Sequence, residues 1–218
     1  MMSLNLGDLR SLEQTLSKLQ GDVTIVYFTE VVNCRHCRQE RELLIELADL
    51  SHKLHLEVYN FTADRDVADQ YEIDKVPGFV LVGKKDYGIR YFGMPSDFEF
   101  QALLEDLVRV SSGQSGLSPD IAKRLDSVSS PLHLEVLTTP GCPFSARAMR
   151  LVHQMAMEND FITGDVVNVD DFPEVAKGYK VLAAPTVVVN EDYLFYGAFE
   201  EPEFVENVLR GSQVQKAV

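Results

Sequence analysis

Two segments of the chain repeat one another at a fixed distance, and this repeat limits the possible folds more than any other feature. Cys34 and Pro77 are 43 residues apart, and the same 43 residues separate Cys142 from Pro185. The residues around each proline also match, because QYEIDKVPGFVLV aligns with GYKVLAAPTVVVN without a gap. Such self-similarity indicates two copies of one structural unit.

Each copy predicts the same order of secondary-structure elements. Residues 23–28 (VTIVYF) and 132–138 (LHLEVLT) are mainly apolar segments that favour strands. A cysteine motif follows each segment and is expected to open a long amphipathic helix. A second strand, a short helix, the proline and a two-stranded hairpin complete the unit. Strands joined by a helix pair in parallel, whereas a hairpin adds antiparallel strands. The predicted fold class is therefore α/β, with two tandem units that each contain a mixed central sheet flanked by helices.

The junction between the units is expected in a segment rich in glycine and serine. Residues 111–119 read SSGQSGLSP, a composition typical of linkers. We therefore divide the chain into residues 1–114 and 115–218. A length of 218 residues suits two domains of about 100 residues each.

Charge and composition exclude several classes of function. With 34 acidic and 20 basic residues, the net charge is -14, which argues against nucleic-acid binding. The N-terminal residues do not form a secretory signal, and no apolar run approaches the ~20 residues of a membrane helix, so we expect no membrane partner and a cytoplasmic location. The three cysteines, an odd number, do not suit a secreted disulfide framework. If these thiols matter, they matter through their chemistry.

The first cysteine motif is CRHC, residues 34–37. A thiol at the start of a helix is near the positive end of the helix dipole and near unpaired backbone N–H groups, so its pKa falls below the free value of about 8.5. We expect Cys34 to be the attacking sulfur and Cys37 the resolving one. Arg35 and His36 add positive charge that stabilises the thiolate, which predicts a pair more oxidising than thioredoxin at roughly -270 mV. Alternatively, both are ordinary solvated residues.

A metal site is the competing interpretation of this motif. Structural zinc needs about four ligands, commonly from two paired motifs. The chain has one C-x-x-C and no second pair, and its histidines at positions 52, 55, 133 and 153 show no ligand spacing relative to it. We therefore predict a redox pair with no metal and no cofactor. An iron–sulfur cluster bridging two chains is the remaining alternative.

Two prolines are expected to help bind substrate. Val76-Pro77 and Ala184-Pro185 each end a loop and enter a predicted strand, a position suited to a cis peptide bond. Such a bond would turn the backbone of Val76 or Ala184 towards the cysteine, where its N–H and C=O groups could pair with an extended substrate strand. Ordinary trans prolines at strand starts are the alternative.

Taken together, these motifs resemble the thioredoxin superfamily. Two such units in tandem, with YFGMP after the first hairpin and TTPGCPFSARAMR at the second site, closely resemble the glutaredoxin-like protein disulfide oxidoreductases of thermophilic archaea and bacteria. The resemblance implies two fused thioredoxin folds, exchange with protein thiols and disulfides in the cytoplasm, and reduction by a flavoenzyme of the thioredoxin-reductase type. The nucleophilic, resolving and cis-proline positions of that family fall on Cys34, Cys37 and Pro77.

The second site departs from the family pattern. That family carries C-P-Y-C there, whereas this chain has CPFS, with Cys142 retained and Ser145 in the resolving position. A hydroxyl cannot resolve a mixed disulfide, so we expect monothiol behaviour of Cys142, with the Ser145 hydroxyl hydrogen-bonded to its sulfur. An inert, buried Cys142 is the alternative.

Two further possibilities remain open at this point. Glu30 could relay a proton to Cys37, although an exposed loop glutamate is the simpler interpretation. The whole chain could instead be a thioredoxin-fold binding module that holds partner proteins with weak redox activity, because a fold does not determine a function.

Overall fold

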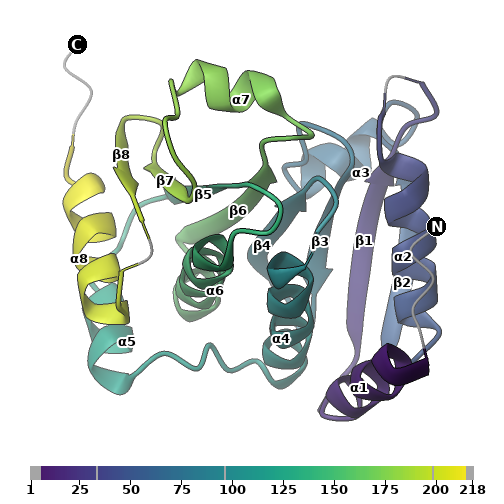
Figure 1. Ribbon diagram of the computed structural model, residues 1–218. Coiled ribbons are helices and arrows are strands. Elements are labelled where there is room, and N and C mark those ends of the chain that lie inside the picture. Colours follow the sequence, from purple (N-terminus) through teal and green to yellow (C-terminus); the bar gives the residue numbers. More distant parts are fainter. Residues whose placement is uncertain (1–5, 33, 96, 198, 215–218) are drawn as a thin grey trace.

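A computed structural model describes residues 6–214, apart from residues 33, 96 and 198. One sheet of eight strands forms its centre, in the order β2-β1-β3-β4-β6-β5-β7-β8 (Figure 1). The strands are β1 (Val23–Thr29), β2 (Leu54–Asn60), β3 (Gly78–Val82), β4 (Asp86–Phe92), β5 (Leu132–Thr138), β6 (Ile162–Asn168), β7 (Thr186–Val189) and β8 (Tyr193–Tyr196). The structure is thus mixed α/β, as the sequence predicts.

Eight helices accompany this sheet in the described part of the chain. They are α1 (Leu6–Leu16), α2 (Cys37–Ala48), α3 (Arg65–Gln70), α4 (Phe98–Ser112), α5 (Pro119–Leu125), α6 (Pro143–Glu158), α7 (Pro173–Gly178) and α8 (Glu201–Gly211). A search of the same residues finds no helix with the length and apolar character needed to cross a bilayer.

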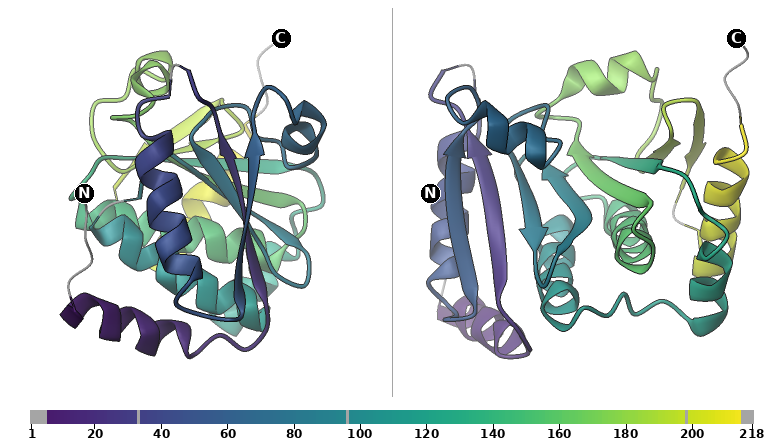
Figure 2. Two further views of the ribbon diagram at one scale, coloured as in Figure 1. Left: turned by 90° about the vertical axis from the view of Figure 1, so that its right-hand side faces the viewer. Right: turned by 180° about the vertical axis from the view of Figure 1, so that it is seen from behind.

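The two halves of the sheet are joined edge to edge, which the sequence did not predict. In the first half β1 pairs in parallel with β2 and antiparallel with β3, and β5 makes the same kinds of pairs with β6 and β7. Strands β4 and β6 then pair in parallel, with Ile89 opposite Gly164 and Phe92 opposite Val167. Pairing satisfies the N–H and C=O groups that two separate sheets would expose at these edges. Figure 2 shows the two halves on opposite sides of this junction.

The helices cover the two faces of the sheet unequally. One face packs against α1, α2, α4, α5, α6 and α8, and its buried residues form a single hydrophobic cluster that extends from Leu12 to Val208. The other face has a smaller cluster, which includes Ala68 of α3 and Phe172 just before α7. Two helices of six residues each are too short to cover that face fully, so part of it carries polar side chains.

A buried polar network lies where the halves meet. Asp106 of α4 accepts hydrogen bonds from the Tyr91 hydroxyl at 2.7 Å and from Arg109 at 2.9 Å, and it lies 2.6 Å from Nδ1 of His153 on α6. Asp106 and His153 are fully buried. Since a buried charge is costly without partners, this network favours one relative placement of α4 and α6.

The strand directions bring both cysteine motifs to one edge of the sheet. β1 is antiparallel to β3, β3 is antiparallel to β4, and β4, β6 and β5 are parallel. β1 and β5 therefore point the same way, and CRHC and CPFS follow their carboxyl ends. Carboxyl ends of parallel strands are where sites in α/β sheets usually form.

Candidate functional site

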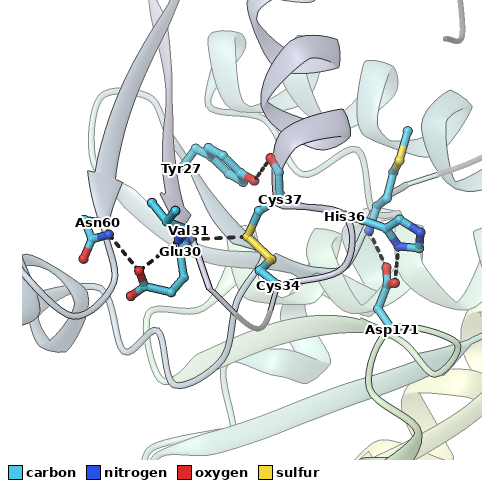
Figure 3. The surroundings of a disulfide bond; sticks show 9 residues. Tyr27, Glu30, Val31, Cys34, His36, Cys37, Asn60 and Asp171 are labelled. Carbon is cyan, nitrogen blue, oxygen red and sulfur yellow. Dashed lines mark hydrogen bonds and ion pairs between the residues drawn. A yellow bond between two sulfur atoms is a disulfide. The ribbon is translucent and has the colours of Figure 1, made fainter.

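The CRHC motif forms a disulfide-closed loop in front of α2. Cys34 and Cys37 are joined by a disulfide (Figure 3). The helix begins at Cys37, with His36 as its N-cap residue, so only the second cysteine lies within the first turn. From the sequence we expect Cys34 in the first turn of this helix and Cys37 one turn further inside, which is wrong in both positions. Cys34 instead lies two residues before the N-cap residue His36. The disulfide to Cys37 joins its sulfur to the first residue of the helix.

The two sulfurs differ in exposure and in their hydrogen bonds. Cys34 is half-buried, whereas Cys37 is only 3% exposed. The backbone N–H of Glu30 donates a hydrogen bond to Cys37 Sγ at 3.4 Å, and the hydroxyl of Tyr27 donates to the Cys37 carbonyl at 2.7 Å. Strand β1 supplies Tyr27 as a buried residue. The resolving position is therefore the enclosed one.

The carboxylate of Glu30 is engaged away from the sulfurs. Its oxygens accept hydrogen bonds from the Thr62 hydroxyl at 2.7 Å, from the Val31 N–H at 2.9 Å and from the Asn60 amide at 3.1 Å. The Thr62 and Val31 bonds hold the pKa of Glu30 below its usual value. A carboxylate kept ionised in this way fixes the loop, and nothing in its contacts supports proton relay to Cys37.

His36 ties the CRHC loop to the second half of the chain. Its Nδ1 forms a hydrogen bond with Asp171, which follows β6, and the other Asp171 oxygen accepts the Met94 N–H at 2.9 Å. The Asp171 side chain is 4% exposed. Its negative charge offsets the positive charge that the sequence predicts at His36. Sequence reasoning missed Asp171, because residue 171 is 135 positions from His36 and no spacing rule connects them.

A fully buried carboxyl group lies on the first turn of α2. Glu40 is 0% exposed, and neither of its oxygens has a hydrogen-bond partner among the residues that the structure describes. Burial, reinforced by the negative charge of Asp171, raises the pKa of Glu40 well above its usual value and favours the neutral acid. Glu40 was also missed, although residues 37, 40, 44 and 47 share the buried stripe of this helix and the 3-4 spacing was readable.

The second site begins directly at a helix terminus. Cys142 is the N-cap residue of α6 and Pro143 is its first residue, as the sequence predicts. Cys142 is a free, half-buried cysteine, and its Sγ lies 3.9 Å from the carbonyl oxygen of Ala184. Cys142 is therefore not the fully buried structural cysteine of the alternative interpretation.

The predicted hydrogen bond between Ser145 and Cys142 is not present, so that expectation was wrong. Ser145 is 0% exposed, and its hydroxyl oxygen has no hydrogen-bond partner within the described ranges. The Ser145 side chain is directed into the core beneath α6, whereas the Cys142 sulfur is directed towards the loop that contains Ala184. Among the residues that the structure describes, no polar side chain is hydrogen-bonded to the Cys142 thiol.

Both predicted proline positions have cis peptide bonds. These are Val76-Pro77 and Ala184-Pro185, which directly precede β3 and β7. The contact between Cys142 and the Ala184 carbonyl brings one cysteine together with the residue before a cis proline. Arg35, in contrast, is an exposed residue between the two cysteines of the disulfide.

The geometry defines a class of protein. A mixed sheet, a cysteine motif at the end of the first long strand, a helix after it and a cis proline before a hairpin define the thioredoxin fold with a disulfide-oxidoreductase-like site. Residues 132–210 match the thioredoxin domain family. A thioredoxin of Methanocaldococcus jannaschii is 35% identical over 80 residues, which cover 36% of this chain and 94% of that protein. The chain belongs to the thioredoxin family.

Solved structures match nearly the whole chain. A protein disulfide oxidoreductase from Aeropyrum pernix is 28% identical with a TM-score of 0.88, over 95% of this chain and 93% of that one. The NTD_N/C domain of alkyl hydroperoxide reductase AhpF from Enterococcus faecalis is 22% identical with a TM-score of 0.86, over 94% and 100% of the two chains. The similarity to the protein disulfide oxidoreductase supports an oxidoreductase in general terms. The similarity to the AhpF domain shows the fold alone.

Several longer curated proteins match as well. They are NADH dehydrogenases and the AhpF component of alkyl hydroperoxide reductase, and they are 21–24% identical to this chain. The chain spans about a third of their length, with shares of 32%, 36% and 34%.

Proposed function

We propose that this chain is a thiol-disulfide oxidoreductase that exchanges disulfides with protein substrates through Cys34 and Cys37. The disulfide between these residues, at the carboxyl end of β1, is the observation that carries the proposal. The unequal burial of the two sulfurs supports Cys34 as the nucleophile, because a substrate disulfide reaches the half-exposed sulfur first.

The exchange runs through two displacements at sulfur. In the reduced chain the Cys34 thiolate attacks one sulfur of a substrate disulfide, and the other substrate sulfur leaves as a thiolate. The Cys37 thiolate then attacks Cys34 Sγ, which releases the second substrate thiolate and closes the Cys34–Cys37 disulfide. Two electrons pass to the substrate, and the reverse sequence oxidises a substrate dithiol.

Exposed apolar side chains next to both cysteine motifs support protein substrates. Val31 is 89% exposed and Val32 is 66% exposed on the loop before Cys34, and Phe144 and Leu182 are exposed near Cys142. Large apolar side chains gathered near a reactive group are typical of surfaces that bind other proteins. The backbone groups of Val76 and Ala184, before the cis prolines, are proposed to pair with the bound segment.

Redox partners must supply or remove the electrons. A flavoenzyme reductase of the thioredoxin-reductase type is the donor that the sequence resemblance implies. Some relatives are AhpF components of alkyl hydroperoxide reductase. They suggest a second candidate for the redox partner of this chain, a protein of a peroxiredoxin system. The cytoplasmic location stays a prediction from the sequence.

For Cys142 we propose monothiol chemistry. Its half-buried thiol at the N-terminus of α6 is suited to accept glutathione or a substrate cysteine. Because position 145 is serine, only an outside thiol, or Cys34, can release the adduct. The two proposed units, residues 1–114 and 115–218, would thus carry a dithiol site and a monothiol site.

Reduction of insulin by dithiothreitol tests the main proposal against a binding module with weak redox activity. The exposed apolar residues favour that alternative as well, because they would serve binding without exchange. The wild-type chain should accelerate insulin precipitation, and Cys34→Ser should not. A wild-type rate equal to that of dithiothreitol alone would support the binding module instead.

A further inference from the structure

A groove opens on the thinly covered face of the sheet, away from both cysteine motifs. It encloses about 1000 Å³ beside α7. His133 and Glu135 alternate with the buried Leu132 and Leu134 along β5, so they lie together on this face. Asp165 is the direct partner of Glu135 on β6. Two neighbouring strands therefore present an imidazole and two carboxylates to one groove.

The three side chains are close enough to share one ion. One ligand atom from each of His133, Glu135 and Asp165 lies within 4.8 Å of the others, and His133 Nε2 is 2.8 Å from Asp165 Oδ2. Ligand atoms that bind one zinc ion in tetrahedral array are about 3.3 Å apart, given bond lengths near 2.0–2.1 Å. Small side-chain rotations would bring the ligand atoms from separations of up to 4.8 Å to this spacing.

An unpartnered oxygen points to a ligand at this place. The Asp165 side chain is 9% exposed, yet its Oδ1 is buried without a hydrogen-bond partner in the described part of the chain. An unsatisfied buried carboxylate oxygen is costly, and a bound cation would satisfy it. Glu135 is held in place by the Tyr179 hydroxyl, which donates to Oε2 at 2.6 Å, as outer partners of metal ligands do.

The charge of the groove favours a cation. Six carboxylates line it, from Glu72, Asp74, Glu135, Asp160, Asp165 and Glu191. Three of them, Glu72, Asp74 and Asp160, are paired with Arg90, Lys75 and Lys85. The basic side chains of the lining are Lys75 and Arg90. Lys75 pairs with Asp74 at 2.6 Å, and Arg90 pairs with Glu72 at 3.2 Å and Asp86 at 3.4 Å. Arg90 is next to Asp165 across the β4–β6 ladder, and its Nη1 is also buried without a hydrogen-bond partner in the described part of the chain.

We propose that His133, Glu135 and Asp165 bind a divalent transition-metal ion, for which Zn²⁺ is the probe. Imidazole with carboxylates suits zinc and its first-row neighbours, and two carboxylates balance the two positive charges. The remaining coordination position faces the groove and is open to water or to a ligand. This site is independent of the proposed redox function, since none of its residues belongs to either cysteine motif.

Isothermal titration with ZnCl₂ tests the proposal on the full chain. The protein carries Cys142→Ser and the closed Cys34–Cys37 disulfide, so that no free thiol competes for zinc. His55→Ala is the matched control, because His55 forms an exposed pair with Asp22 at 3.5 Å. We expect one saturable site in the parent and in His55→Ala, and at least about 10-fold weaker binding in Asp165→Asn and His133→Gln.

Two further measurements keep the outcome decisive. Circular dichroism in EDTA establishes that each variant is folded, and His133→Gln, at a half-exposed position, serves if Asp165→Asn unfolds. Co²⁺ in place of Zn²⁺ should give d–d absorption without thiolate charge-transfer bands. Absence of saturable binding in the parent, or equal affinity in the parent and both ligand variants, overturns the proposal.

Discussion

The two cysteine sites follow strands that point the same way, yet they differ in the residues that surround the sulfur. At the first site Cys37 is enclosed, its sulfur accepts a backbone hydrogen bond, and His36 is paired with Asp171. At the second site Cys142 caps α6 directly, and the position of the resolving cysteine holds a buried serine. Similar backbone frames therefore support a dithiol pair in one half and a lone thiol in the other.

A buried carboxyl group in the first half sharpens this difference. Glu40 is three residues after Cys37, and the residue at the same distance after Ser145 is Ala148, which is fully buried. At these two equivalent helix positions, the first site therefore has a buried acid and the second site has an alanine.

The largest expected effect is the loss of exchange activity from one site alone. Cys34→Ser should reduce insulin reduction to the rate of dithiothreitol alone, because no other residue of the CRHC motif is an accessible thiol. Cys142→Ser should retain most of the wild-type rate. The precipitation assay reports both rates, and the comparison fails if Cys142→Ser is the inactive variant.

A second prediction converts the lone thiol into a pair. Ser145→Cys restores the spacing of the first site, so mild oxidation should close a disulfide between Cys142 and the new thiol. A thiol count with Ellman's reagent on the denatured, oxidised chain should fall from one free thiol in the wild type to none in this variant. Ser145→Ala is the control and should keep one. A thiol at position 145 that stays reduced would mean that the two backbone frames differ.

A third, smaller effect concerns the link between the halves. Asp171→Asn removes the negative charge beside His36, which should stabilise the thiolate and make the Cys34–Cys37 pair more oxidising by about 20 mV. His36→Pro should shift the potential in the opposite direction. Redox titration against glutathione measures both shifts, and Asp170→Asn, at the neighbouring position, should change little. Equal potentials in all three variants would remove the electrostatic argument.

The smallest effect is a pH dependence of stability. Because the pKa of Glu40 is raised in the folded chain, the native state binds more protons than the unfolded state above about pH 4.3, and stability falls as pH rises. Glu40→Gln lacks this loss, so its melting temperature relative to wild type should increase from pH 4 to pH 8. Glu46→Gln, exposed on the same helix, should show no such trend. A constant difference across this range would contradict the raised pKa.

Local sequence patterns predicted the secondary structure well, whereas contacts between residues far apart in the sequence were not predicted. The order of elements from each long strand to its hairpin and the cis prolines followed from periodicity and turn chemistry, whereas α4 and α8, which follow the hairpins, were not predicted. The β4–β6 ladder could not be predicted, since edge pairing between halves leaves no spacing signal. The same holds for the pairing of His36 with Asp171. The polar groove was partly readable, because LHLEV alternates apolar and polar residues, but its partner Asp165 lies on another strand.

Trapping of a mixed disulfide tests the difference between the two sites most directly. In Cys37→Ser the resolving thiol of the first site is absent, so a substrate attached to Cys34 cannot be released internally. After incubation of the reduced variant with insulin and acid quenching, peptide mass spectrometry should find the insulin cysteine joined to Cys34. Attachment at Cys142, with Cys34 unmodified, would contradict the account.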